Sequence, residues 1–345
     1  MLPVRALSGL TFFAALASLA IATYAGESMD RYNVVWESPS RDASGQMPLG
    51  NGDIAAGVYA IQDGDLYLLL AKNDAYNYNG DIFKTGRVRI SLAPNPFAKG
   101  RPFRQTLDLA TGSIRIEADG VKLRIWADAN RPVYHVQVDS LHDISVTAQA
   151  EFWERFDSCQ HNSSRAPIPN ATQDVCLTRN GKILWYFAVG DRSVFPADME
   201  YYDVQHMTNA FPDPYRFNTF GNLLESPELE LIEGSSGDAS LVGKGKNFDI
   251  RIHAVNQQAH EASTWIESIE SRSKQPIDAD NDWIAHCDWW SKFWDRSWII
   301  ASDNRLPPEE RERLSSETAS GRRRETDGGA LVSQSYNVFR FLMAC

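Results

Sequence analysis

The residues whose types and spacing are best suited to chemistry lie in two short polar segments near the N-terminal end of the chain. The first is Met47–Gly57, in which Asn51 and Asp53 alternate with glycines. The second is a predicted polar-aromatic turn of sequence Lys-Asn-Asp-Ala-Tyr, which carries Asn73 and Asp74. These four side chains are candidates for substrate binding or for a domain interface. Asn and Asp also commonly bond to the backbone of their own turn, and the pattern favours this second interpretation.

The two glycines that flank Asn51 permit left-handed backbone and close approach of another surface. They do not form a dinucleotide-binding loop, because the next glycine is Gly57 and the flanking segments are predicted strands. His260-Glu261 begins a zinc-protease pattern, but Thr264 stands where the second His is required. We therefore predict no catalytic residue, no cofactor and no metal site from these patterns.

A stripe of tryptophans marks a predicted helix near the C-terminal end. Trp283, Trp290 and Trp294 recur on one face of the segment Asp278–Trp298. Trp290 and Trp294 are candidates for a surface that stacks on sugar rings or for a domain interface. The strict helical period favours the packing face of a linker helix.

Two cysteines, Cys159 and Cys176, flank a polar stretch with no metal-like spacing. In an oxidising compartment they are a candidate disulfide that would close this loop. The alternative is two unpaired thiols in an insertion, and the sequence does not decide between them because it gives no Cα separation.

The N-terminal residues 1–25 predict a signal peptide. Arg5 precedes the uncharged apolar run Leu7–Ala22, and Ala20-Ile21-Ala22 has the small-x-small pattern of a cleavage site. An uncleaved membrane anchor is the alternative, since the run approaches the ~20 residues that span a bilayer. The small residues and the polar exit favour cleavage. We expect a secreted or periplasmic protein that has no membrane association after cleavage.

The composition limits the partners of the chain. Lys and Arg total 34 against 45 Asp and Glu, a formal net charge of −11. A general nucleic-acid-binding protein needs a basic face, so we expect no nucleic-acid partner. The 10 Trp, 12 Tyr and 16 Phe indicate either stacking surfaces or an aromatic-rich core.

Residues 30–257 have the pattern of an all-β domain. Short alternating or apolar runs are broken repeatedly by Gly, Asn, Asp and Pro. Ser113–Ala118 and Lys122–Ala127 are the arms of a predicted hairpin around Asp119-Gly120. Val133–Val138 and Ile144–Ala150 are predicted as two further strands. Many short strands without intervening helices predict a mainly β fold, a large antiparallel β-sandwich.

Residues 258–328 predict a helical linker. Glu261–Ser273 and Asp278–Trp298 are its expected helices, and Arg305–Thr326 is an exposed connector. An apolar stripe in Ala330–Cys345 predicts one more helix, which reaches Cys345 without a Gly or Pro stop. We expect that the protein continues beyond this helix. The alternative is a C-terminal helix that docks on the sandwich.

The motif Pro48–Asp53, followed by a strand pair and the Asn73-Asp74 turn, resembles the N-terminal domain of glycoside hydrolase family 95, the α-L-fucosidase group. It is more similar still to the domain-of-unknown-function family numbered 5703. The further segments that carry this resemblance are Tyr32–Trp36, Gly86–Arg89, Pro94–Phe97, Phe103–Gln105, Trp126–Asn130, Trp289–Ser297 and Val332–Tyr336.

The resemblance implies a β-sandwich, a helical linker and then an (α/α)₆ barrel that carries the catalytic groups. Residues 329–345 would then be the first helix of a truncated helical catalytic domain. The acid and base that glycosidic cleavage needs would lie beyond Cys345, so no catalytic residue is carried over. We expect the chain to be inactive alone and to have two partners, carbohydrate and its own C-terminal helical barrel.

The predicted function is the N-terminal sandwich portion of a secreted glycoside-hydrolase-like protein that acts on extracellular polysaccharide. The alternative is a non-catalytic carbohydrate-binding or structural β-sandwich protein.

Overall fold

The computed structural model describes residues 29–151, 175–191, 193–233, 239–301, 306–310, 313 and 328–345. The predicted signal peptide, Cys159 and most of the predicted connector lie outside the described residues. Among the described helices, none combines the length and the apolar character that a membrane span requires.

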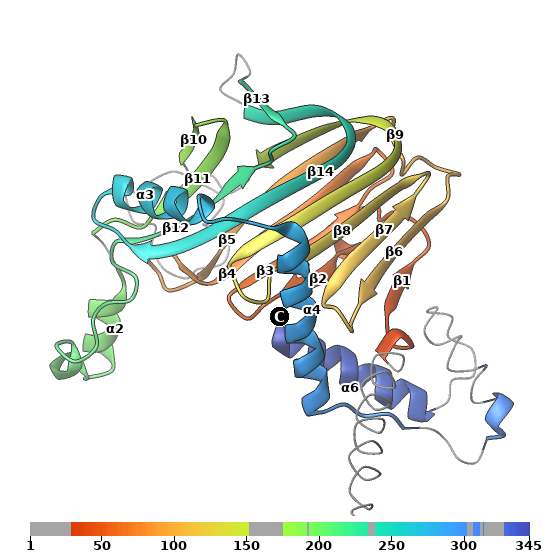
Figure 1. Ribbon diagram of the computed structural model, residues 1–345. Coiled ribbons are helices and arrows are strands. Elements are labelled where there is room, and N and C mark those ends of the chain that lie inside the picture. The colour runs from red at the N-terminus through yellow and green to blue at the C-terminus, as the bar shows by residue number, and fades with distance from the viewer. Residues whose placement is uncertain are drawn as a thin grey trace, which may run out of the picture.

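The strands form one hydrogen-bonded sheet that folds into two layers (Figure 1). All of its pairings between named strands are antiparallel. The first layer contains β1 (Val34–Trp36), β6 (Phe103–Asp108), β7 (Ser113–Ala118), β8 (Val121–Ala127), β12 (Asn218–Glu225), β11 (Lys182–Ala188) and β10 (Val175–Arg179). The second layer contains β2 (Met47–Gly50), β3 (Ile54–Ala60), β4 (Asp65–Tyr76), β5 (Ile82–Ala93) and β13 (Glu230–Glu233).

Two long strands, β9 (Val133–Glu151) and β14 (Ala239–Gln258), belong to both layers. The first part of β9 pairs with β8, and its last part, residues 145–151, pairs with β5. The register between β9 and β14 shifts between Gly245 and Asn247, where such an irregularity bends a strand. The prediction of two separate strands at 133–138 and 144–150 is therefore wrong, because the exposed residues between them continue the same strand.

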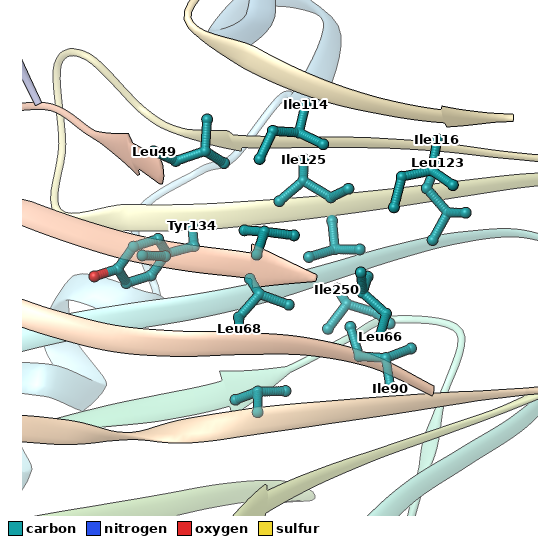
Figure 2. Packing of buried hydrophobic residues seen from close by; sticks show 14 of the residues in the cluster. Leu49, Leu66, Leu68, Ile90, Ile114, Ile116, Leu123, Ile125, Tyr134 and Ile250 are labelled. Carbon is teal, nitrogen blue, oxygen red and sulfur yellow. The ribbon is translucent and has the colours of Figure 1, made fainter. Parts of the chain in front are cut away.

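The core lies between the two layers (Figure 2). Side chains that alternate along the strands point inward and are almost fully buried, among them Leu66, Leu68, Ile90, Ile114, Ile116, Leu123, Ile125 and Ile250. Burial of one such side chain stabilises the fold by about 1.5–3 kcal/mol. The prediction of a mainly antiparallel β fold, followed by helices, is confirmed.

The three longer helices follow the last strand in the chain, whereas the shorter ones lie between strands, and α2 projects from the sandwich (Figure 1). The longer ones are α3 (Ala262–Ser273), α4 (Ala279–Arg296) and α6 (Gly328–Ala344), and the shorter ones are α2 (Phe195–Tyr201), η1 (Ala43–Gly45) and η3 (Gln205–Met207). Asp278 caps α4, since its side chain accepts hydrogen bonds from the backbone N–H groups of Asp280 and Asn281 at 3.2 and 3.1 Å.

Helix α4 is fixed to the turn between β6 and β7 by its buried aromatic face. The indole N–H of Trp294 donates to the carbonyl oxygen of Leu109 at 2.7 Å. The ring of Trp290 lies directly over Gly112, which has φ +56°. Gly112 thus meets two requirements, a left-handed backbone and the absence of a Cβ where the indole packs.

We predict that Gly112→Ala destabilises the fold by roughly 3 kcal/mol, from left-handed strain plus overpacking against Trp290. Gly181→Ala is the matched control, because Gly181 has φ +74° and open space around its Cβ position. The control is expected to cost about 1 kcal/mol. Urea unfolding of both variants measures the difference, and equal losses would contradict the packing role of Trp290 at Gly112.

Candidate functional site

The two polar segments predicted from the sequence meet at one end of the sandwich. The backbone N–H of Asn73 donates to the carbonyl oxygen of Asp53 at 2.9 Å, and its side-chain amide donates to Gly52 at 2.8 Å. The second segment was predicted as a turn, but it is the final part of β4. Its pairing with β5 is irregular between Ala71 and Tyr76, which explains the polar, turn-like sequence.

Asn51 fixes its own turn and ties it to another. Its side-chain oxygen accepts hydrogen bonds from the backbone N–H groups of Asp53 and Ile54, both at 2.9 Å. Its side-chain NH₂ group donates to the carbonyl oxygens of Asp128 at 2.7 Å and Arg131 at 3.1 Å. The first contacts are the local turn bonds that the sequence favours. The contacts to the β8–β9 turn have no signature in the sequence.

Asp53 and Asp74 surround a buried lysine. The ammonium group of Lys72 lies 2.6 Å from an oxygen of Asp53 and 2.8 Å from one of Asp74. The Lys72 side chain is 7% exposed, whereas the two aspartate side chains are 43% and 47% exposed. The charge is buried next to two partners, as buried ammonium groups require. Both carboxylates therefore stand at the surface in fixed positions.

Lys72 was not singled out from the sequence. The feature that could have revealed it is the alternation of buried and less buried residues along β4, in which position 72 is one of the buried positions. A lysine at such a position needs an anion nearby, and the aspartate two residues later on the same strand is one of the two that it finds.

The end of helix α6 reaches the same place. The backbone N–H of Gly52 donates to the carbonyl oxygen of Cys345 at 2.9 Å. A Cβ at Gly50 would overlap the backbone and side chain of Cys345. The glycines of the first segment therefore serve the close approach of another backbone.

Trp290 and Trp294 are buried, unlike the carboxylates of Asp53 and Asp74. Trp290 is fully buried and Trp294 is 3% exposed, and Trp290 stacks on Phe341 of α6 with ring centroids 5.3 Å apart. The structure thus places both indoles at the contact between helices and sandwich, where no sugar ring reaches them. Cys176 is exposed on β10, and its predicted disulfide partner lies outside the described residues.

A second polar cluster lies where α4 crosses the β8–β9 turn. The guanidinium group of Arg131 contacts Asp128 at 3.1 Å and also forms an ion pair with Asp282 of α4. His286 of α4 accepts from the backbone N–H of Ala129 at 3.1 Å and donates to the carbonyl oxygen of Thr111 at 2.7 Å. These contacts link the helix to two turns of the sandwich.

Two buried histidines of this region, His286 and His135, are neutral at pH 7. Burial lowers the pKa of His286 to about 4, opposed by its hydrogen bond to Thr111. Burial, with the nearby Arg251 and Arg131 cations, lowers the pKa of His135 well below its ordinary value. His135 stacks on Trp126, with ring centroids 4.4 Å apart and planes 4° from parallel. Neither nitrogen of His135 has a hydrogen-bond partner among the described residues.

Comparison with known proteins identifies one family. Residues 35–299 match the N-terminal model of the "Domain of unknown function (DUF5703)". No curated protein matches the chain. Among solved structures, the chain is similar to a putative kojibiose phosphorylase from human microbiome, at 10% identity and a TM-score of 0.41 over 85% of this chain. The chain spans 40% of the length of that protein.

The family match confirms the resemblance to family 5703. It does not extend to glycoside hydrolase family 95 specifically.

We predict that acid destabilises the protein partly through His286. The folded-state pKa of about 4 is below the unfolded value of 6.5, so unfolding takes up a proton between these pH values. The stability from neutral His286 is complete above pH 6.5 and falls as the pH decreases towards 4. Wild type should lose about 2–3 kcal/mol more than His286→Gln between pH 7 and 4.5. Urea unfolding at both pH values measures this, and an equal loss in the two proteins would contradict it.

We further predict that Gly50→Ala loosens α6, because the added methyl group would occupy the position of Cys345. Hydrogen exchange of residues 341–345 should become faster, while exchange in β4 and β9 stays slow. Gly245→Ala is the control, since a Cβ there meets Phe248 at an ordinary 3.6 Å. Unchanged exchange in α6 of the Gly50 variant would show that the contact does not hold the helix.

Proposed function

We propose that this chain, which belongs to the family of the domain of unknown function DUF5703, is the β-sandwich portion of a glycoside-hydrolase-like protein acting on extracellular polysaccharide. The family membership follows from the match over residues 35–299. The glycoside-hydrolase character rests on the ordered set of sequence motifs, from the Gly50-Asn51-Gly52 segment to the segment around Tyr336.

The observation that carries the proposal is the pair of exposed carboxylates held around Lys72. Asp53 and Asp74 present acceptor oxygens at fixed positions, and the exposed Asn73 lies between them in the sequence. Sugar hydroxyls are donors, and ordered carboxylate and amide groups bind them with directional hydrogen bonds. This end of the sandwich is therefore the proposed carbohydrate-binding surface.

We assign a binding role to these carboxylates, not an acid–base role. Glycosidic cleavage needs an acid and a second carboxylate on either side of the scissile bond. Asp53 and Asp74 instead bond to the same ammonium group, so they act from one side. The acid and base would come from the helical barrel that the resemblance implies as a partner.

A non-catalytic carbohydrate-binding protein is the second candidate. The same observation favours it, because a pair of carboxylates shared by one lysine suffices for binding. We also propose export to a secreted or periplasmic location, on the charge, apolar run and cleavage pattern of residues 1–25.

The test uses the purified chain with three oligosaccharide classes: fucosylated, uronosyl-containing and neutral glucosyl. Calorimetry should detect binding of at least one class, and Asp53→Asn or Asp74→Asn should each weaken it by about tenfold or more. Each variant leaves one carboxylate beside Lys72, so the buried ammonium group keeps an anionic partner. Asp288→Asn is the control, since its ion pair with Lys292 is exposed on α4.

Release of reducing sugar separates the two candidates. Cleavage by a longer family member that includes a helical domain, with binding alone by this chain, supports the first. Binding without turnover in both supports the second. Cleavage at an enzymatic rate by this chain would contradict the assignment of a binding role, and absence of binding to every class would contradict both candidates.

A further inference from the structure

We propose that Asp128, His135 and Asp282 form a binding site for a divalent transition-metal ion of the Zn²⁺ type, at the contact between α4 and the sandwich. The site shares no residue with the proposed carbohydrate surface, although Asn51, two residues before Asp53, bonds to the backbone of Asp128. Its three residues come from the turn after β8, from β9 and from the first turn of α4.

The donor atoms already lie close to one another. One ligand atom from each residue lies within 4.8 Å of the other two, and the ring nitrogen Nε2 of His135 is 3.9 Å from Oδ2 of Asp128. Two donors on one tetrahedral Zn²⁺, each at about 2.0–2.2 Å, are roughly 3.4 Å apart. Small side-chain rotations therefore bring all three onto one ion, with the remaining coordination position left for water.

His135 supplies the independent evidence for a ligand. Its side chain has no exposed surface, and neither ring nitrogen has a hydrogen-bond partner among the described residues. An unsatisfied buried polar group costs about 1–3 kcal/mol, so it needs an explanation. The parallel ring of Trp126 fixes the plane of the imidazole. A bound metal ion would satisfy one nitrogen of this neutral ring, which is the form that coordinates metals.

Arg131 is the competitor for this site. In the structure its guanidinium group bridges the carboxylates of Asp128 and Asp282, where it neutralises part of their charge. A divalent cation and the guanidinium group cannot occupy the same place, because both are positive. The Arg131 side chain can move towards solvent, since it is 26% exposed and one of its nitrogens lies 3.5 Å from the carbonyl oxygen of Pro276 at the surface. Metal binding is therefore an exchange in which Arg131 moves outward.

The type of donor selects the class of metal. Calcium and magnesium take oxygen ligands, whereas imidazole suits zinc, iron, copper and nickel. One imidazole nitrogen with two carboxylate oxygens favours Zn²⁺ or a neighbouring first-row ion. Such an ion would connect α4 directly to β9, in place of the present connection through Arg131.

The experiment uses the whole chain after chelator treatment, titrated with Zn²⁺ in a calorimeter. Wild type should bind one ion at this site, and His135→Gln and Asp282→Asn should each weaken binding by at least tenfold. Asp280→Asn is the matched control, because Asp280 lies in the same first turn of α4 and is exposed outside the cluster. It should bind Zn²⁺ as wild type does.

Arg131→Ala is the decisive variant. Removal of the competing cation should strengthen Zn²⁺ binding by tenfold or more and raise the thermal midpoint in the presence of Zn²⁺. A cluster that is only a structural ion-pair network would lose stability in this variant without gaining metal affinity. Cys176→Ser tests whether the exposed thiol of Cys176 binds Zn²⁺ instead. The Zn²⁺ affinity of this variant should equal that of wild type.

Three results would overturn the proposal. The first is no Zn²⁺ binding by either wild type or Arg131→Ala. The second is Zn²⁺ binding whose affinity Asp282→Asn leaves unchanged. This result decides the question even if His135→Gln fails to fold. The third is Ca²⁺ binding that is tighter than Zn²⁺ binding, which would exclude a transition-metal site.

Discussion

The architecture of this protein depends on one side-chain amide, that of Asn51. It bonds to two backbone N–H groups of its own turn and to two carbonyl oxygens of the β8–β9 turn. Asn51 is partly buried, and its four hydrogen bonds hold together two loops that are distant in the sequence. The β8–β9 turn carries Asp128 and Arg131, which face α4, while the Asn51 turn receives the end of α6 through Gly52. Both helices are thus oriented by the same loop pair.

Close backbone approach is the second requirement of this end of the molecule. Gly112 lies under the ring of Trp290, and Gly50 lies against Cys345. Neither position has room for a Cβ. The tryptophan stripe and the glycines of the polar motif therefore serve the same purpose. They allow two helices to pack closely against loops whose backbone groups also form hydrogen bonds. This explains why the most distinctive sequence motif serves the interface at least as much as a ligand.

Local patterns predicted the fold because each strand and helix has its own period. Alternation gave the hairpin at 113–127, and the helical period gave α3 and α4 nearly to the residue. The long strand β9 was missed because its middle residues, on the bend between layers, are exposed and lose the alternation. The partners of Asn51 and the cluster around His135 were missed for another reason. These contacts join residues far apart in the sequence. The periodicity of a single segment cannot predict a contact between a loop, a strand and a helix.

The sharing of β9 and β14 between the layers has a mechanical consequence. In a sandwich of two separate sheets, the layers can slide or part after only the core contacts between them are lost. Here the covalent chain itself runs through both layers twice, so shear between them would also have to break the β9–β14 ladder at its bend. The two layers are therefore expected to unfold together as one cooperative unit. Among the described strands, no single break in the chain divides one layer from the other, because β9 and β14 each contribute to both.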